Sequence, residues 1–198
     1  MTRPRILALA GSSRRESLAR RLAQACVEPL SEAGAVVELI ELGDYPMPLY
    51  NGDLERESGL PATAAALQRE LHGSDGLLVV NPEYNGSITP LLKNTLDWCS
   101  RPNPEDEARS GGAVFAGRAA AVLATSPGPM GGMRVLFHVR DILGYLGMHV
   151  IPQQLGVGNA GGAFAADGRL ANERQQGMLE ATLQSLATTA ARLAPESR

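Results

Sequence analysis

Five short apolar runs, separated by longer segments with helical spacing, limit what this chain can fold into. They are RILALAG, AVVELIEL, DGLLVVN, RAAAVLATS and HVIPQQ, at residues 5–11, 35–42, 75–81, 118–126 and 149–154. The first, third and fourth runs are almost continuously apolar, which is typical of central parallel strands covered on both faces. Strands that alternate with helices predict an α/β fold with a five-stranded parallel sheet and helices on both of its faces.

Five helices are expected between and after these strands. The first covers 17–34, where Leu18, Leu22, Cys26 and Leu30 repeat every fourth position, and Pro29 inside it predicts a kink or an early end. The others are expected over about 61–72, 89–99, 131–147 and 170–194. The polar stretches 43–60 and 100–117 are expected to be long surface loops, because each returns to a predicted strand.

The amino-acid composition limits the classes of protein to which this chain can belong. With 198 residues, 44% of them hydrophobic, and a net charge of −3, the chain is expected to form one domain over residues 1–198. Its scattered basic residues argue against a nucleic-acid partner, and no segment has the roughly 18 continuous apolar residues that span a membrane. The apolar run after the N-terminal basic residues is too short for a signal peptide. Cys26 and Cys99 are expected to be buried core thiols, and the cytoplasm is the expected compartment.

The loop after the first strand reads GSSRRES and leads directly into a helix. Gly11 allows a tight turn, and Ser12, Ser13, Arg14 and Ser17 place hydroxyls and a guanidinium beside the free amides of a helix N-terminus. That combination suits a phosphate group that is held and not cleaved. The loop is neither a Walker A motif nor GxGxxG. An ordinary strand-to-helix turn with a serine cap remains the alternative.

The third and fourth strands are also followed by unusual loops. After the third comes PEYNGSITPLLKNTLDW, a polar connection before Thr89 and Pro90, which are expected to be the N-cap and first residue of a helix. This loop offers backbone groups and Tyr84 to a planar ligand, although Tyr84 could equally pack on the surface. After the fourth strand comes TSPGPMGGMR, whose glycines permit close approach to a ligand or to another subunit, or serve only the loop. All three loops are expected on the same edge of the sheet, where open α/β sheets bind ligands.

Together these segments resemble the NADPH-dependent FMN reductase family, the flavodoxin-like group that includes quinone and chromate reductases. The resemblance covers most of residues 5–155, and the seventeen residues from Pro82 to Trp98 carry it best. It implies a flavodoxin-like three-layer sandwich with strand order 2-1-3-4-5, a non-covalently bound FMN, and NADPH or NADH as electron donor. It also implies a homodimer or homotetramer with flavin sites near the subunit interface. In that arrangement Lys93, Asn94, Asp97 and Trp98 lie on a helix used partly for subunit contact, while Trp98 could equally belong to the core.

The resemblance also assigns site residues position by position. Ser12, Arg14 and Ser17 match the residues that hold the FMN phosphate, and Leu18 and Ala19 match the next two positions. The family often has asparagine at the position of Ala19, so one polar contact would be missing here. Two further groups match the loops around the flavin ring: Pro82, Glu83, Tyr84, Asn85 and Gly86 in the second loop, and Ser126 and Gly128 in the third.

The implied activity is passage of hydride from NAD(P)H to FMN and of two electrons onward to a small-molecule acceptor such as a quinone, free flavin, chromate or an azo compound. The cofactor carries this chemistry, so no catalytic side chain and no metal are expected. His72, His138 and His149 lie outside the three loops, and structural roles are expected for His138 and His149. Two alternatives remain open: a flavodoxin-type FMN electron carrier without nicotinamide turnover, and a flavin-dependent binding or sensor module.

Overall fold

The five predicted strands form one parallel sheet. A computed structural model describes residues 3–194, so the ends of the predicted domain at residues 1 and 198 lie outside the described residues. The strand order is β2-β1-β3-β4-β5, and every neighbouring pair is parallel, which confirms the predicted flavodoxin-like topology. The strands are β1 (Arg5–Ala10), β2 (Val36–Ile40), β3 (Gly76–Pro82), β4 (Ala119–Thr125) and β5 (His149–Val157).

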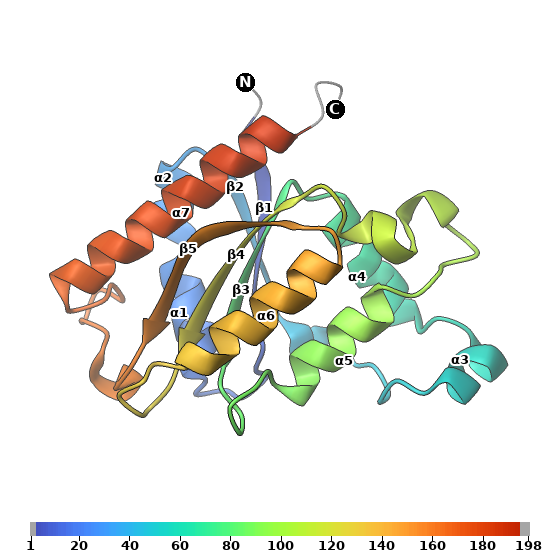
Figure 1. Cartoon of the computed structure of the whole chain (residues 1–198), viewed down its shortest axis with the longest axis horizontal. Helices are drawn as coiled ribbons and strands as arrows, with labels where there is room; N and C mark the ends of the chain where they lie inside the picture. The colour runs from blue at the N-terminus through green and yellow to red at the C-terminus, as the bar shows by residue number, and fades with distance from the viewer. Residues whose placement is uncertain (1–2, 195–198) are drawn as a thin grey trace.

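Helices cover both faces of the sheet, so the fold has three layers (Figure 1). One face carries α1 (Leu18–Ala25), α2 (Val27–Glu32) and α7 (Glu173–Leu193). The other carries α4 (Ala62–His72), α5 (Pro90–Cys99) and α6 (Met133–Tyr145). Each face has its own hydrophobic core, and alternate residues of the central strands point into one core or the other.

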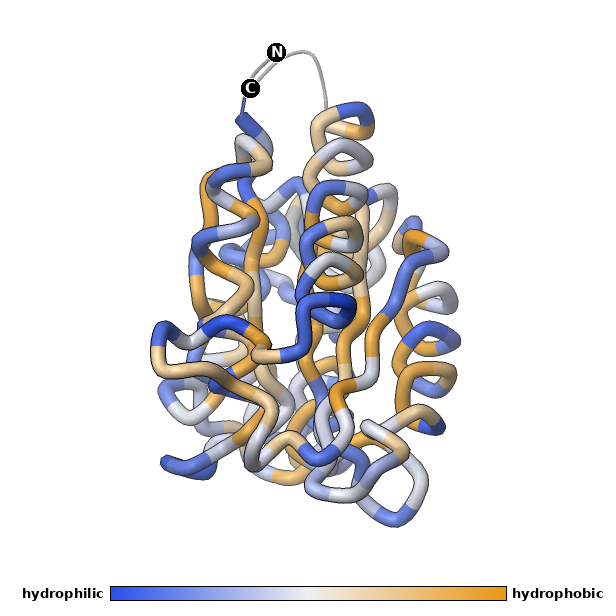
Figure 2. Tube along the Cα trace, turned by 90° about the vertical axis from the view of Figure 1, so that its left-hand side faces the viewer, coloured by the Kyte–Doolittle hydropathy of each residue, from blue (hydrophilic) through white to orange (hydrophobic). Residues whose placement is uncertain are grey.

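Burial on both faces explains the continuous apolar runs in the sequence. All seven residues of β4 are buried, and so are the first six of β3. In Figure 2 hydrophobic and hydrophilic residues alternate along the helices, whereas the strands between them are largely hydrophobic. Cys26 and Cys99 are free and buried, as predicted, one in each core. Burial raises the pKa of both thiols well above its ordinary value.

The first predicted helix is two helices. Helix α1 ends at Ala25, and α2 begins at Val27 after Cys26. The break lies one turn before Pro29, which has no N–H to donate to the carbonyl of Ala25 and whose ring crowds that carbonyl. The prediction of a kink or an early end is therefore confirmed.

The sequence predicted a long surface loop over 43–60, and that prediction is only partly right. The stretch contains α3 (Gly52–Ser58), a helix with no buried residue and therefore no apolar periodicity to predict it from. Short 3-10 helices lie at η1 (Leu42–Asp44), η2 (Glu107–Arg109), η3 (Gly111–Val114) and η4 (Ala160–Gly162).

The segment before α3 is fixed to α5 by hydrogen bonds at Pro48 and Tyr50, where the backbone N–H of Tyr50 donates to Asn94 Oδ1 at 2.8 Å. The oxygen of Pro48 accepts hydrogen bonds from Asn94 Nδ2 at 2.9 Å and from Trp98 Nε1 at 2.7 Å. Trp98 is fully buried, and its ring meets that of Tyr50 edge to face with centroids 5.1 Å apart. Of the two roles considered for Trp98, the structure therefore shows the core one.

A span across a lipid bilayer requires a long helix of mainly apolar residues. Between residues 3 and 194 no helix combines the length and the apolar character needed to cross a membrane.

Candidate functional site

A cavity of about 320 Å³ opens where β1, β3 and β4 end, and we call it the loop cavity. It lies at the carboxyl edge of the parallel sheet, where Pro82 at the end of β3 pairs in register with Thr125 at the end of β4. Residues of all three predicted loops line it: Ser12, Arg14, Ser17, Leu18, Ala19, Pro82, Glu83, Tyr84, Thr125, Ser126 and Pro127.

The structure brings together most of the predicted site residues, but not all of them. Nine of the twelve line the loop cavity, whereas Asn85, Gly86 and Gly128 do not. Thr125 and Pro127 line it without having been predicted. Both are immediate chain neighbours of Ser126, so adjacency to a predicted residue was the signal that could have found them.

The first loop supplies the polar end of the loop cavity. Ser17 is the N-cap of α1, and its hydroxyl accepts from the backbone N–H of Arg20 at 3.3 Å. Ser12 Oγ accepts from the backbone N–H of Arg14 at 3.4 Å. Both serines are buried while Arg14 is exposed, so the hydroxyls form the floor and the guanidinium can reach in from solvent. The positive end of the α1 dipole adds to this attraction for an anion.

A buried polar cluster fixes the start of the first loop. Gly11 lies so close to Asn81 that a Cβ on Gly11 would be 1.7 Å from Asn81 Oδ1. The amide nitrogen of Asn81 donates to the carbonyl of Pro82 at 2.8 Å, and Thr89 Oγ1 lies 3.2 Å from Asn81 Oδ1. Thr89 is the N-cap of α5 and Pro90 its first residue, as predicted. The first and second loops are therefore tied together beneath the loop cavity.

The second loop contains a tight two-residue hairpin, residues 84–87. The backbone N–H groups of Tyr84 and Ser87 each donate to the other residue's carbonyl at 3.0 Å. Asn85 and Gly86 have φ values of 50° and 80°, which is a type I′ turn, and Asn-Gly is the sequence that favours it. The two hydrogen bonds of the turn use Tyr84 and Ser87 and not the N–H groups of Asn85 and Gly86.

This hairpin rests on α6 at two points. Glu83 accepts from the backbone N–H of Arg134 at 3.1 Å and from its guanidinium Nη1 at 2.9 Å. At the last residue of the hairpin, Ser87 Oγ lies 2.8 Å from His138 Nδ1. The sequence reading placed His138 outside the loops, and it missed this contact because the partners lie 51 positions apart in the chain.

The third loop contributes a wall made of main chain. Ser126 Oγ accepts from the backbone N–H of Gly128 at 3.1 Å, and the carbonyl of Gly128 accepts from the N–H of Asn159 at 3.0 Å. A Cβ on Gly131 would lie 2.8 Å from the backbone of both Gly156 and Gly158. Two backbones thus meet where no side chain fits, and this contact holds the third loop against the end of β5.

Charge in the loop cavity is unevenly distributed. Among its lining residues, Arg14, Glu83 and Tyr84 are the ionisable ones, and the guanidinium of Arg134 offsets the charge of Glu83. The first loop therefore keeps its positive character. Across residues 3–194 no group of three His, Cys, Asp or Glu side chains is arranged to hold a metal ion. The arrangement suits a ligand with an anionic end and a planar end.

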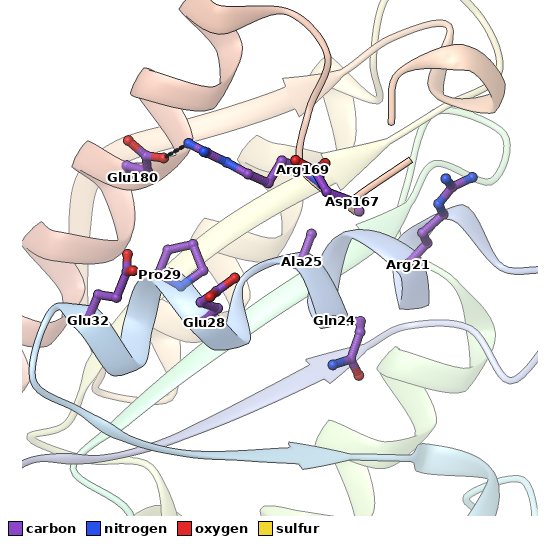
Figure 3. Close-up of a pocket in the computed structure, with 10 residues that line it drawn as sticks. Arg21, Gln24, Ala25, Glu28, Pro29, Glu32, Asp167, Arg169 and Glu180 are labelled. Carbon is purple, nitrogen blue, oxygen red and sulfur yellow. Dashed lines mark hydrogen bonds and ion pairs between the residues drawn. The ribbon is translucent and has the colours of Figure 1, made fainter. Parts of the chain in front are cut away.

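A larger cavity, of about 460 Å³, lies elsewhere, between α1, α2, the loop before α7, and α7 itself (Figure 3). Its charged lining is mainly acidic, with Glu28, Glu32, Asp167 and Glu180 against Arg21 and Arg169. Arg169 Nη2 and Glu180 Oε1 form an ion pair at 2.8 Å. Hydrogen bonds from Gln176 and Arg169 lower the pKa of Glu180. No residue of the three loops after β1, β3 and β4 that were predicted to bind a ligand lines this cavity, so the loop cavity is the candidate site.

Known proteins share this sequence pattern along most of the chain. Residues 4–162 match the sequence model of the NADPH-dependent FMN reductase family. An NAD(P)H-dependent FMN reductase of Pseudomonas aeruginosa is 32% identical over 92% of each chain. A quinone reductase of Pseudomonas putida is 34% identical, again over 92% of each chain. An NADPH:quinone oxidoreductase of Arabidopsis thaliana is 34% identical over 96% of this chain and 93% of its own.

Solved structures share the fold. FerB, a flavoenzyme NAD(P)H:(acceptor) oxidoreductase from Paracoccus denitrificans, superposes with a TM-score of 0.80 at 25% identity, over 96% of this chain and 98% of its own. An archaeal flavodoxin superposes with a TM-score of 0.58 at 10% identity, over 94% of this chain and 99% of its own, which shows a shared fold and nothing more.

Proposed function

We propose, because this chain belongs to the NADPH-dependent FMN reductase family, that it is an FMN-dependent NAD(P)H oxidoreductase whose cofactor binds in the loop cavity. One observation of the structure carries the assignment of the site. A single cavity joins a phosphate-type site, built from Ser12, Arg14, Ser17 and the N-terminus of α1, to residues 82–84, which lead from β3 into the hairpin. FMN has a phosphate at one end and a planar ring at the other, so it matches the two ends of this cavity.

The residues present fit FMN at both ends. Ser12 and Ser17 would donate hydroxyl hydrogen bonds to the phosphate, and Arg14 would add a charge-assisted bond from solvent. Ala19 is buried beside them, where the family often has asparagine, so the methyl group offers contact without a hydrogen bond. Pro82, Glu83, Tyr84 and Ser126 would line the ring end of the cofactor, and the N–H of Gly128 holds the hydroxyl of Ser126.

Bound FMN supplies the two-electron chemistry between a nicotinamide and an acceptor. The chain's own residues would bind FMN and orient it. Asn85 and Gly86 follow the lining residue Tyr84, and their N–H groups, which the turn's own hydrogen bonds do not use, would stabilise negative charge on FMN bound at this edge of the loop cavity. The exposed Tyr84 ring, 46% accessible, offers an aromatic surface at the open side of the loop cavity.

Quinones are the acceptor class that the relatives favour, since several of them are named quinone reductases. Free flavin, chromate and azo compounds belong to the wider set that an open site would admit. The same fold in an archaeal flavodoxin keeps an electron carrier as the second candidate, but its 10% identity carries no functional argument. The family match favours the reductase.

A homo-oligomer belongs to the same proposal. Its support is a row of exposed apolar side chains on α6: Met133 at 46%, Phe137 at 55% and Tyr145 at 91% accessible. Beside them on α5, Lys93 and Asp97 form an exposed ion pair with an N–O distance of 2.7 Å. A dimer or tetramer, the cytoplasm as compartment, and a single FMN-binding domain over the whole chain stay predictions.

The test is one cuvette experiment with the purified full-length protein. An absorbance spectrum is recorded, then NADPH and afterwards a benzoquinone are added without oxygen. We expect a yellow protein that NADPH bleaches and the quinone restores. A yellow protein that neither NADPH nor NADH bleaches would favour the electron carrier. A colourless protein that added FMN cannot reconstitute would contradict the assignment of the loop cavity.

A further inference from the structure

Two side chains of α6 that do not line the loop cavity contact the loop that forms one of its walls. Arg134 and His138 are four residues apart, so they project from the same face of α6, one turn from each other. Arg134 binds Glu83, the residue before the hairpin 84–87, and His138 binds Ser87, its last residue. The two contacts therefore hold the hairpin at both of its ends.

Contacts between the hairpin and Arg134 go beyond the ion pair. A Cβ on Gly86 would lie 3.7 Å from Arg134 Cδ, so the aliphatic part of the arginine packs under the tip of the turn. The Glu83 side chain is only 13% accessible, whereas that of Arg134 is 65% accessible. The carboxylate is thus largely removed from water and depends on its partners, the guanidinium and the N–H of Arg134.

Helix α6 is a firm support for these contacts. Its residues Val135, Leu136 and Val139 are buried in the core between α6 and the sheet. Its N-cap, Gly132, has φ 76°, and a Cβ there would lie 2.9 Å from the Cβ of Ala124 on β4. The first turn of α6 is therefore pressed against the sheet. The hairpin, in contrast, has exposed residues at Tyr84 and Asn85.

We propose that Arg134 and His138 are positioning residues for the FMN site: by holding both ends of the hairpin they fix Glu83 and Tyr84, which line the loop cavity, and with them the N–H groups of Asn85 and Gly86. The proposal rests on the function proposed above, because it takes the ligand of the loop cavity to be FMN. Both residues act through the hairpin and not on the cofactor itself. Losing either contact lets the turn move and weakens donors that favour the more negative, reduced form of FMN.

The experiment compares Arg134→Met and His138→Phe with the full-length wild type. Both replacements keep most of the side-chain volume and remove the polar contact with the hairpin. Each variant is stripped of cofactor and titrated with FMN, and the midpoint potential of the bound FMN is measured. We expect the Kd for FMN to rise on the order of tenfold in each variant, the size of one lost hydrogen bond. We expect the midpoint potential to become more negative.

Matched controls come from the same chain. Arg174 on α7 and His149 on β5 are also exposed, so Arg174→Met and His149→Phe make the same chemical changes away from the hairpin. Both should bind FMN as the wild type does. His138→Gln is the rescue variant, because its amide can still share a hydrogen bond with Ser87, and its potential should return towards that of the wild type.

The outcomes separate the two proposals. If wild type binds FMN and both hairpin variants match the controls in Kd and potential, the positioning role is wrong and the proposed function stands. If the variants lose urea stability without cofactor but keep the wild-type potential when loaded, their role is structural and the inference is again wrong. A wild type that binds no FMN contradicts the proposed function, and the inference with it. Coupled losses in the double variant Glu83→Gln, Arg134→Met would support the positioning role.

Discussion

The hydroxyl of Thr89 donates a hydrogen bond to the carbonyl oxygen of Gly11 across 2.7 Å and across 78 positions of the chain. The same oxygen atom of Thr89 caps α5 by accepting from the backbone N–H of Leu92 at 3.3 Å. One buried side chain therefore starts a helix and joins it to the first loop.

Replacing Thr89 by valine should destabilise the protein because the shape is kept while both hydrogen bonds are lost. We expect the free energy of unfolding to fall by about 1–3 kcal/mol, the cost of a lost cap and an unsatisfied buried carbonyl. Urea titration measures it. Thr89→Ser keeps the hydroxyl, so its free energy of unfolding should fall clearly less. An equal fall in the two variants would contradict the role given to the hydroxyl.

Gly11→Ala should destabilise the protein through a direct collision. Its new Cβ would lie 1.7 Å from Asn81 Oδ1, and Asn81 is fully buried, so the asparagine must move. We expect a loss of about 1–3 kcal/mol in the free energy of unfolding. Gly177 on α7 is the control, since a Cβ there meets nothing within 4 Å. Gly177→Ala should instead stabilise the protein by about 0.5–1 kcal/mol, because alanine favours a helix.

Arg14→Ala should lower the occupancy of FMN more than it lowers turnover per bound flavin. The guanidinium lines the phosphate end of the loop cavity and does not lie at the turn where the ring is proposed to bind. A loss of about 1.5–3 kcal/mol in binding is expected for one charge-assisted bond. Flavin content and activity per flavin are measured together. Arg15→Ala removes an exposed neighbour that does not line the loop cavity and should leave flavin content unchanged.

Glu55 should make stability depend on pH in the acid range. Hydrogen bonds from Arg101 Nε at 2.8 Å and from the Tyr50 hydroxyl at 2.9 Å lower its pKa in the folded protein. A lowered pKa gives stability that is present above the unfolded value of about 4.3 and is lost as pH falls through the folded value.

Glu55→Gln tests this dependence. At pH 7 the variant should be less stable than wild type by about 0.5–1 kcal/mol, a size typical of a partly exposed ion pair. The difference should close as pH falls through the lowered folded-state pKa of Glu55, because the wild-type side chain then carries no charge either. Glu57→Gln, at an exposed position on the same helix, is the control. A difference that stays constant from pH 7 to pH 3 would show that charge is not its cause.

Much of the fold could be predicted because its strands are buried on both faces. Such strands appear in the sequence as unbroken apolar runs, and the parallel order puts the loops after β1, β3 and β4 on one edge. The helix α3 could not be predicted in the same way. It buries no residue, and Glu55 on it reaches Arg101 beyond the end of α5, a partner that local patterns do not reveal.

The residues of the candidate site were predictable where they are consecutive in the chain. Loops that follow strands are recognised in a sequence by their turn residues, and nine of the predicted positions do line one cavity. The support from α6 was not predictable. Arg134 and His138 meet the hairpin from a helix that lies about 50 positions later, and each looks like an ordinary solvated residue of that helix.

The close backbone contact of Gly131 with Gly156 and Gly158 restricts which substitutions this chain can accept. Any side chain at these positions would push two backbones apart and open the sheet's edge beside the loop cavity. Selection for a new electron acceptor must therefore work on other positions, and Tyr84 and Pro127 are exposed ones that line the loop cavity. A mutant library for that purpose should leave the glycines unchanged and randomise those two.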